Sequence, residues 1–315
     1  MPNKASEYLE SSFLKPLLNQ NDITDITYNG ESLFYLSNTK GRQKSEIEIG
    51  KEEIGDFLKQ IANLCEKQFS FSSPILDTSF SRYRLNAVFH SLARQKGEKT
   101  YSFALRIASS DCKIDDSFFP KDVKEIFLEA LRNHESVVIG GPTGSGKTEL
   151  EKWLLMNMPQ FTRVIVIDNV EELDLTHHEE IDETIWVTSP NENGSYAALV
   201  KNVLRSCPDY IVLAETRGEE FEDALNAVMS GHPIITTLHA QTIDSMVDRM
   251  ARLVMLSPKN HKKKEVKDDI IKHFSLLVML GRIFKENEVN RYIESVGRID
   301  KKSGRIHKIY ERGKA

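Results

Sequence analysis

The feature that most constrains the fold of this sequence is a glycine-rich run of eight residues. It reads Gly141-Pro142-Thr143-Gly144-Ser145-Gly146-Lys147-Thr148, and it fits the pattern G-x-x-x-x-G-K-[ST] at every position. Val137-Val138-Ile139 before the run is typical of a strand, and Glu149 to Met156 after it is typical of a helix. Because glycine lets the backbone wrap closely around phosphate, and the helix end adds a positive dipole, the run predicts a phosphate-binding loop.

Two side chains of this loop have expected roles toward a nucleotide. Lys147 is expected to reach the β- and γ-phosphates of ATP, and the Thr148 hydroxyl is expected to ligate Mg²⁺. The alternative is a glycine-rich turn that binds nothing. It is disfavoured because a strand and a helix flank the loop in the arrangement that nucleotide binding uses.

Hydrophobic periodicity divides the chain into two domains. From residue 136 on, short apolar strands alternate with helices, which predicts an α/β domain with a largely parallel sheet over residues 121–315. Residues 1–110 are predicted to form a mixed α+β domain. Residues 111–120 contain three Asp and one Pro and are expected to form the linker.

The first domain shows both strand and helix patterns. Strands are expected at 23–28 and 33–36, in a hairpin-like pair around Asn29-Gly30, and again at 83–89 and 101–107. A helix is expected from Ile54 to Phe69, because its apolar residues recur near the helical period.

Composition excludes several classes of protein. The chain has 42 Lys and Arg against 47 Asp and Glu, so it is not a nucleic-acid-binding polycation. Its three cysteines have no C-x-x-C spacing, so no zinc site is expected. The longest apolar run, Phe274 to Leu280, is too short to span a bilayer, and the N-terminus has no signal-peptide pattern. A location in the reducing cytosol is therefore expected.

One local basic segment, Lys259 to Glu265, carries four lysines in an otherwise acidic chain. The favoured interpretation is a solvated loop or helix face. The alternative is a contact with an anionic lipid or an acidic partner.

Acidic residues follow two of the predicted strands of the second domain. Val164 to Ile167 ends at Asp168, and Tyr210 to Ala214 ends at Glu215, with Arg217 and Gly218 close behind. In open α/β sheets, ligands bind beyond the carboxyl ends of the strands, so both acids are expected to lie near the phosphate loop. Glu215 is the favoured catalytic candidate, whereas Glu171 is interpreted as a helix cap.

Two histidines, His232 and His239, flank another predicted strand, Pro233 to Leu238. A neutral imidazole could hydrogen-bond a phosphate or an acid, and an imidazolium could stabilise charge. A purely structural role stays open for both. A metal site is not expected, because no Cys or further His lies at ligand spacing.

Four motifs of the second domain, taken in order, resemble those of the secretion ATPase superfamily. This superfamily comprises the hexameric ATPases of type IV secretion, type II secretion and type IV pilus assembly. Gly141–Thr148 resembles its Walker A loop, Val166–Leu173 its Asp box, Leu204–Gly218 its Walker B segment and Gly231–Ala240 its His box. In the first domain, Asp25–Gly30, Arg84–Ala87 and Leu105-Arg106 also resemble family segments.

The resemblance implies a fold and a function. The expected fold is α/β, a RecA-like P-loop NTPase domain with a smaller N-terminal α+β domain of PAS-like type. The expected function is ATP hydrolysis by a hexameric cytoplasmic motor that powers protein or DNA secretion, or pilus assembly. Such a motor would work at the inner face of the cell membrane with platform proteins as partners. The compact length and the lack of a tetracysteine insert are more similar to the type IV secretion and Tad-type pilus branch.

The resemblance also assigns roles to residues. The residues with expected catalytic roles are Glu215, Glu172, Asp168, His239, Arg106 and Arg84. The residues expected to contact nucleotide are Gly141, Pro142, Thr143, Gly144, Ser145, Gly146, Lys147, Thr148, Arg217 and His232. Thr148 is the expected ligand of Mg²⁺. For Arg84 and Arg106 a phosphate-binding role also fits their chemistry, because the guanidinium is a permanently charged planar fork that binds oxyanions bidentately. The alternative is a structural role in which they pair with local acids such as Asp77.

The sequence departs from the family pattern in the Asp box, and this keeps alternatives open. Asp168 stands where Glu is usual and Asn169 follows it, and no Asp adjoins Glu215 to hold Mg²⁺. One alternative is therefore a nucleotide-gated assembly scaffold with little turnover. A P-loop kinase or a DNA-strand ATPase would explain the loop, but not Arg217, the histidines and the N-terminal arginines together. Direct nucleic-acid binding is not supported.

Overall fold

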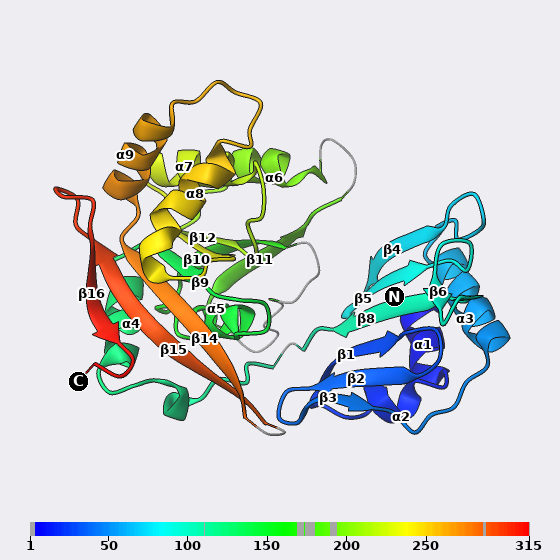
Figure 1. Ribbon diagram of the computed structural model, residues 1–315. Coiled ribbons are helices and arrows are strands. Elements are labelled where there is room, and N and C mark those ends of the chain that lie inside the picture. Colours follow the sequence, from blue (N-terminus) through cyan, green and yellow to red (C-terminus); the bar gives the residue numbers. More distant parts are fainter. Residues whose placement is uncertain are drawn as a thin grey trace. The chain divides into compact units, whose positions relative to one another are not determined.

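The computed structural model describes residues 4–109, 111–168, 173, 180–189, 194–285 and 288–314. The chain forms two compact units, each described by itself (Figure 1). Unit 1 comprises Met1–Ser109 with Phe284–Asn290, and unit 2 comprises Ser110–Ile283 with Arg291–Ala315.

Unit 1 is an antiparallel sheet with helices on one face. Its elements are α1 (Lys4–Ser11), α2 (Lys15–Leu18), β1 (Ile23–Tyr28), β2 (Leu33–Ser37), β3 (Gly41–Lys44), α3 (Lys51–Leu64), β4 (Ile75–Phe80), β5 (Tyr83–Val88), β6 (Arg94–Gln95), β7 (Glu98–Lys99) and β8 (Ser102–Ile107). The main sheet has the order β3-β2-β1-β8-β5-β4, and β6 and β7 form a separate ribbon.

Alternation along the strands of unit 1 separates a buried face from a polar face. In β8, Phe103 and Leu105 are buried in the core with α1 and α3, whereas Ala104 and Arg106 are exposed. In β5, Leu85 is buried in the same way. The period of two therefore leaves the second face of this sheet open to polar side chains.

Unit 2 alternates helices and strands, as the sequence predicts. Its elements are η1 (Asp116–Phe118), α4 (Val123–Arg132), β9 (Val137–Gly140), α5 (Lys147–Met156), β10 (Arg163–Asp168), β11 (Asp182–Val187), α6 (Tyr196–Val203), β12 (Tyr210–Leu213), α7 (Phe221–Met229), β13 (Ile234–Leu238), η3 (Ile243–Ser245), α8 (Met246–Val254), α9 (Lys263–His273), β14 (Leu276–Lys285), β15 (Glu288–Ile299) and β16 (Ile306–Glu311).

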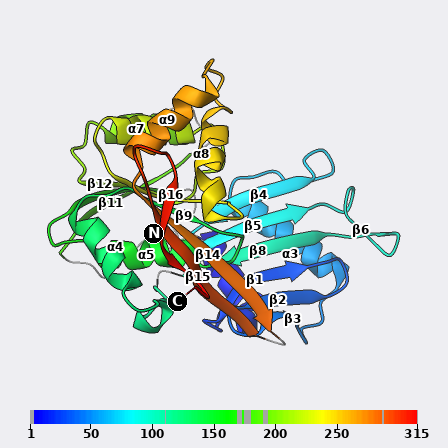
Figure 2. The ribbon, with the colours of Figure 1, turned by 60° about the vertical axis from the view of Figure 1, so that its left-hand side comes forward.

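The sheet of unit 2 has the order β11-β10-β12-β13-β9-β14-β15-β16 and is covered by helices on both faces (Figures 1 and 2). The pairings from β11 to β14 are parallel, and β15 pairs with β16 antiparallel. One core contains α4 and α5, with Phe127 and Trp153, and the other contains α6 to α9. This three-layer α/β architecture confirms the predicted fold class and brings the carboxyl ends of five adjacent parallel strands, from β11 to β9, to one edge.

Two predictions about unit 1 have different outcomes. The hairpin around Asn29-Gly30 is confirmed: β1 and β2 pair antiparallel, and Gly30 has a φ of 97°. The helix predicted from Ile54 to Phe69 is wrong at its end, because α3 stops at Leu64. Glu66 takes a positive φ of 55°, and the Lys67 amide bonds back to the Ala62 carbonyl. This helix-terminating turn ends the helix in spite of the apolar pattern.

In the part of the chain that the structure describes, no helix combines the length and the apolar character that crossing a membrane requires.

Candidate active site

The glycine-rich run forms a tight loop between β9 and α5, as the sequence predicts. Gly144 and Gly146 have φ angles of 73° and 94°, a region in which residues with a side chain are strained. The Leu150 amide bonds to the Gly146 carbonyl, so the first turn of α5 starts directly at the loop. The N-terminus of α5, with its positive dipole end, therefore opens directly onto the loop.

Lys147 and Ser145 give this loop two polar groups that can bind an anion. The buried Lys147 Nζ donates to the carbonyl oxygens of Gly141 and Pro142, at 3.2 Å each. The Ser145 hydroxyl is fully buried and has no hydrogen-bond partner among the described residues. A Cβ added at Gly141 would lie 2.6 Å from that hydroxyl, so the loop closes around it. An unused buried donor beside a lysine fits a phosphate group.

A carboxylate at the same carboxyl edge of the sheet lies beside the loop. The segment that follows β12 stays bonded to β13, since the Thr216 amide donates to the Thr237 carbonyl at 3.0 Å. Glu215 therefore meets His239: its Oε1 lies 3.2 Å from His239 Nε2. Its Oε2 forms an ion pair with Arg217. The structure thus brings together three of the predicted residues, Glu215, Arg217 and His239.

The charge state of Glu215 suits an acceptor of hydrogen bonds. Burial by itself raises the pKa of Glu215, but the hydrogen bond and the charge of Arg217 outweigh it, with help from His239 and Lys147. The net pKa lies below the usual value for Glu. The carboxylate is therefore ionised throughout the neutral range.

The charge state of His239 differs from that of Glu215, because His239 is neutral. Burial lowers the pKa of His239 first, and the positive charge of Lys147 lowers it further. The charge of Glu215 and a hydrogen bond with the backbone of Gly141 only partly oppose this. His239 is therefore a neutral imidazole at pH 7, able to bond Glu215 without carrying its own charge.

A titration tests this assignment. In an NMR titration of the histidine ring signals, assigned with His239→Gln, we expect a pKa for His239 below 6.5. Lys147→Ala should raise that pKa, because it removes the nearby cation. Since the folded protein then binds fewer protons than the unfolded chain, His239 should lower the stability as the pH falls below 6.5. A pKa above 6.5 would contradict the assignment.

Asp168 lies at the end of β10 on the same edge of the sheet. Its side chain is almost fully buried, and its Oδ2 accepts a hydrogen bond from the Leu173 amide at 3.3 Å. It therefore holds the backbone at Leu173. Glu171 and Glu172 lie outside the described residues.

The donor set for a divalent cation is small. Thr148 is half-buried at the start of α5, where its hydroxyl suits a nucleotide-bound Mg²⁺. Across the described ranges, His, Cys, Asp and Glu form no group of three or more that could hold a metal ion. This chemistry fits Mg²⁺, which commonly arrives with phosphate oxygens and keeps most of its water.

The structure places two arginines at the loop that the sequence analysis missed. Arg291 of β15 donates from Nε to the Gly144 carbonyl at 2.9 Å. A Cβ added at Gly144 would lie 2.7 Å from Nη1 of Arg282, on β14. Both arginines belong to unit 2 but are far from the loop in sequence, and no motif marks them. Only the pairing of the last strands onto β9 brings them there.

Arg84 and Arg106 lie on the polar face of the unit 1 sheet. They are direct partners in the β5–β8 register, so their side chains share one face. Arg106 is 3.3 Å from Asp25, and Arg84 is 3.5 Å from Asp77; both pairs are partly exposed. Each arginine is thus paired with a local acid, and both lie on the same face of the sheet.

His232 is not brought to the loop within unit 2. It precedes β13, whereas the loop and His239 lie at the carboxyl edge. A five-residue strand, about 17 Å long, separates the two histidines. Within the described part of unit 2, His232 therefore lies at the opposite edge of the sheet from the group around Lys147.

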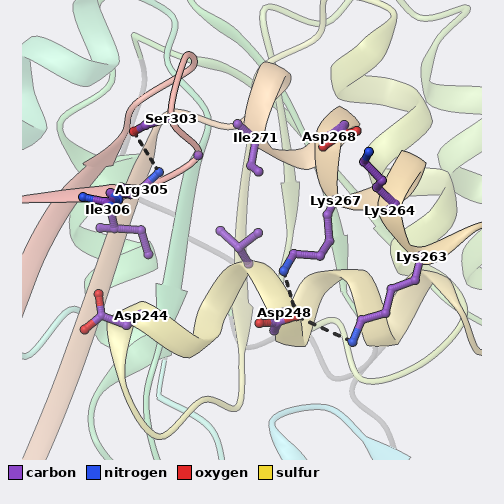
Figure 3. A pocket seen from close by; sticks show the side chains of 12 residues that line it. Asp244, Asp248, Lys263, Lys264, Lys267, Asp268, Ile271, Ser303, Arg305 and Ile306 are labelled. Carbon is purple, nitrogen blue, oxygen red and sulfur yellow. Dashed lines mark hydrogen bonds and ion pairs between the residues drawn. The ribbon is translucent and has the colours of Figure 1, made fainter.

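The basic segment borders a groove of about 910 Å³ lined by α8, α9 and the turn between β15 and β16 (Figure 3). There Lys263 and Lys267 both point at Asp248, at 3.6 and 3.1 Å. Lys259 pairs with Glu222 at 2.7 Å, and Lys262 with Glu265 at 2.9 Å. Most of the positive charge of the basic segment is therefore neutralised within the chain. This favours the interpretation of the segment as a solvated face over a contact with lipid.

Comparisons with known proteins agree with this geometry. Residues 96–280, more than half of the chain, match the family described as Type II/IV secretion system protein. The chain is 29% identical over 274 residues to an uncharacterized protein of Bacillus anthracis, pXO2-25, covering 83% of this chain and 59% of that protein. It is 32% identical over 163 residues to the type IV secretion system protein VirB11 of Brucella suis, covering 50% and 44%.

One solved structure shares the fold over nearly the whole chain. The ATPase DotB of Legionella pneumophila matches with a TM-score of 0.70 and 21% identity, covering 95% of this chain and 82% of that one. The chain belongs to the type II/IV secretion system protein family, the secretion ATPase superfamily, and resembles its type IV secretion branch. It spans about half the length of the curated relatives reported above.

Proposed function

We propose that this chain is the subunit of a motor ATPase that hydrolyses ATP to ADP and phosphate. The observation that carries the proposal is the placement of Glu215. It is an ionised carboxylate at the edge of the sheet, paired with Arg217 and 3.2 Å from His239 Nε2, and the charge of Lys147 in the phosphate loop lowers its pKa. A phosphate loop alone binds nucleotide, whereas an acid fixed beside it can orient water for attack.

Each residue has a defined part in this proposal. Lys147 leaves the loop carbonyls and binds the β- and γ-phosphates, while the loop amides and the N-terminus of α5 offset further negative charge. Glu215 accepts a hydrogen bond from the attacking water, Arg217 holds its other oxygen, and the neutral His239 lies beside it. The Thr148 hydroxyl is the protein ligand for Mg²⁺, which when bound neutralises charge on the phosphates.

One observation favours the alternative of a nucleotide-gated scaffold. Asp168 is buried and its Oδ2 is engaged by the Leu173 amide, so part of the Asp box serves the backbone. A chain that uses Asp168 in this way could bind ATP with little turnover.

Steady-state phosphate release from the purified chain separates the two, measured with and without membranes and with Lys147→Ala as the blank. The motor requires release that saturates with ATP and exceeds the blank. ATP binding with release no greater than the blank would instead establish the scaffold.

We further propose that Arg84 and Arg106 bind phosphate oxygens of a nucleotide. Support comes from their placement as opposed cations on one open sheet face. If ATP draws these arginines to its γ-phosphate and hydrolysis releases them, then turnover moves unit 1 against unit 2. Arginines of this kind contribute roughly 10³–10⁵ in rate in other phosphoryl-transfer enzymes.

Arg106→Ala is expected to fold normally and keep most of its ADP affinity, but to lose most phosphate release. Arg84→Ala should have a milder effect. The fold should survive, because the Arg106–Asp25 pair is partly exposed and such pairs contribute only about 0–1 kcal/mol. Mixing Arg106→Ala with Lys147→Ala protein tests whether the site is shared: recovered activity means that it lies between subunits. Full activity in both single arginine variants would contradict the closure model.

The assembly and its location follow from the family alone. We propose a homo-oligomer, specifically a hexamer, that docks on secretion or pilus platform proteins at the inner face of the cell membrane. The mass in solution, measured with and without nucleotide, tests the assembly. A monomer under all conditions would contradict it.

A further inference from the structure

Tyr196 carries a buried hydroxyl that the mechanism above does not use. It is the first residue of α6, which Ser195 caps by accepting a hydrogen bond from the Ala198 amide at 3.3 Å. The ring packs against the core formed with α6 to α9. Its hydroxyl oxygen is buried and has no hydrogen-bond partner among the described residues.

The topology places this hydroxyl at the edge of the sheet that carries the acids. α6 follows the carboxyl end of β11, which pairs parallel with β10, so its first residue lies near the end of β10. Burial raises the pKa of Tyr196 well above its usual value, and four carboxylates raise it further: Glu151, Glu220, Asp168 and Glu215. The hydroxyl therefore stays protonated and lies within electrostatic range of these four carboxylates, although none of them accepts a hydrogen bond from it.

A buried hydroxyl without a partner is unfavourable for folding, because it has lost its hydrogen bonds to water. Phenylalanine would fill the same volume without that loss. Glu215 Oε1 is likewise buried without a hydrogen-bond partner among the described residues, and its charge acts on Tyr196. A water molecule that joins the two oxygens would satisfy both, and Glu215 is the acid proposed to orient the attacking water.

We propose that Tyr196 is a positioning residue for the attacking water. Its hydroxyl oxygen accepts a hydrogen bond from one O–H of that water, while Glu215 accepts a hydrogen bond from the other. The water is then held at two points with a lone pair directed at the γ-phosphate. The inference rests on the proposed ATPase function. It adds a second hydrogen-bond partner for the attacking water, which Glu215 alone does not supply.

The test compares Tyr196→Phe with a matched control, Tyr210→Phe. The Tyr210 hydroxyl is also buried, but it donates to the Glu135 carbonyl at 3.1 Å, and Tyr210 begins β12 at the opposite edge of the sheet. In Tyr196→Phe we expect kcat to fall about 10- to 100-fold, the value of one or two charge-linked hydrogen bonds. The KM for ATP and the affinity for a non-hydrolysable ATP analogue should stay within about twofold.

Thermal stability gives a second readout with opposite signs in the two variants. Tyr196→Phe should melt at the same temperature as the wild type or higher, because it removes an unpaired polar group. Tyr210→Phe should melt lower and keep its kcat, because it removes a satisfied bond far from the site. A lower kcat with undiminished stability is an outcome that a structural role for Tyr196 would not produce.

The outcomes separate this inference from the function on which it rests. If the wild type releases no more phosphate than Lys147→Ala, the ATPase proposal fails and the role of Tyr196 fails with it. If the wild type is active and Tyr196→Phe is equally active, only the role of Tyr196 is overturned. An equal loss of kcat in Tyr210→Phe would also overturn it, since the effect would then come from packing.

Discussion

Lys147→Ala is expected to fold normally, to bind ATP at least about 100-fold more weakly and to release no phosphate above background. Lys147 is the cation of the phosphate loop, and its Nζ is bonded to two loop carbonyls. Without it the β- and γ-phosphates lose their charge-assisted hydrogen bonds, which are about twice as strong as neutral ones.

The fold should survive for two reasons. The loop geometry depends on the glycines and on the start of α5, which alanine keeps, and alanine is the best helix former. The two carbonyls that lose the ammonium lie at the loop, where water replaces it.

The measurement combines calorimetric ATP binding, phosphate release and thermal melting. Lys264→Ala is a matched control: Lys264 also lies in the first turn of a helix, but it has no acidic partner among the described residues and is far from the loop in sequence. The control should bind and hydrolyse as the wild type does. Near wild-type phosphate release from well-folded Lys147→Ala would refute the assignment of the active site.

The phosphate loop was predictable because its chemistry is local. A loop that wraps around phosphate needs glycine where φ is positive, and Gly144 and Gly146 occupy such positions. The flanking strand and helix are short continuous segments whose hydrophobic patterns are readable from the sequence. The expected positions of Asp168 and Glu215 followed from one topological rule, since parallel strands end at the same edge, and His239 lies at that edge as well.

The residues that the sequence analysis missed lie where tertiary structure decides. Arg282 and Arg291 reach the loop because β14 pairs with β9 and β15 follows it in the sheet, an order that no local pattern encodes. In the sequence, nothing distinguishes Tyr196 from an ordinary aromatic residue on the buried face of an amphipathic helix. That its hydroxyl lacks a partner is visible only when its neighbours are known.

His232 shows what a sequence motif leaves undetermined. The sequence motif pairs it with His239, but residues at the two ends of one strand point to opposite edges of the sheet. A strand of five residues is long enough to separate them. Motif membership therefore gave its family role without giving its place relative to the phosphate loop of the same chain.

The second large effect is expected for Glu215→Gln: ATP binding retained or tightened, and turnover lowered by about 10²–10³-fold. The amide has the same shape as the carboxylate, so the contacts beside Arg217 and His239 persist without the charge. A neutral amide is a weaker acceptor for the hydrogen of the attacking water. It also removes a negative charge close to the triphosphate, so binding should not suffer.

The stability of Glu215→Gln should change little. The pKa of Glu215 is depressed in the folded chain, so its ion pairs stabilise the protein above the pKa of the unfolded chain and this contribution is lost only as the pH falls through the lower folded value. At pH 7 the variant loses that contribution, but Arg217 is more than half exposed and water can solvate it. We expect a melting temperature within a few degrees of the wild type.

Glu222→Gln is the matched control for this variant. Glu222 is also a buried glutamate of unit 2 with a depressed pKa, paired with Lys259 and His261, but it belongs to α7 and not to the strand edge. Its substitution should cost stability and leave kcat unchanged. Phosphate release under saturating ATP, with analogue binding measured in parallel, separates the two glutamates. If Glu215→Gln keeps its turnover while Glu172→Gln loses it, the roles of these two acids are the reverse of those proposed, and the water is oriented from the Asp box.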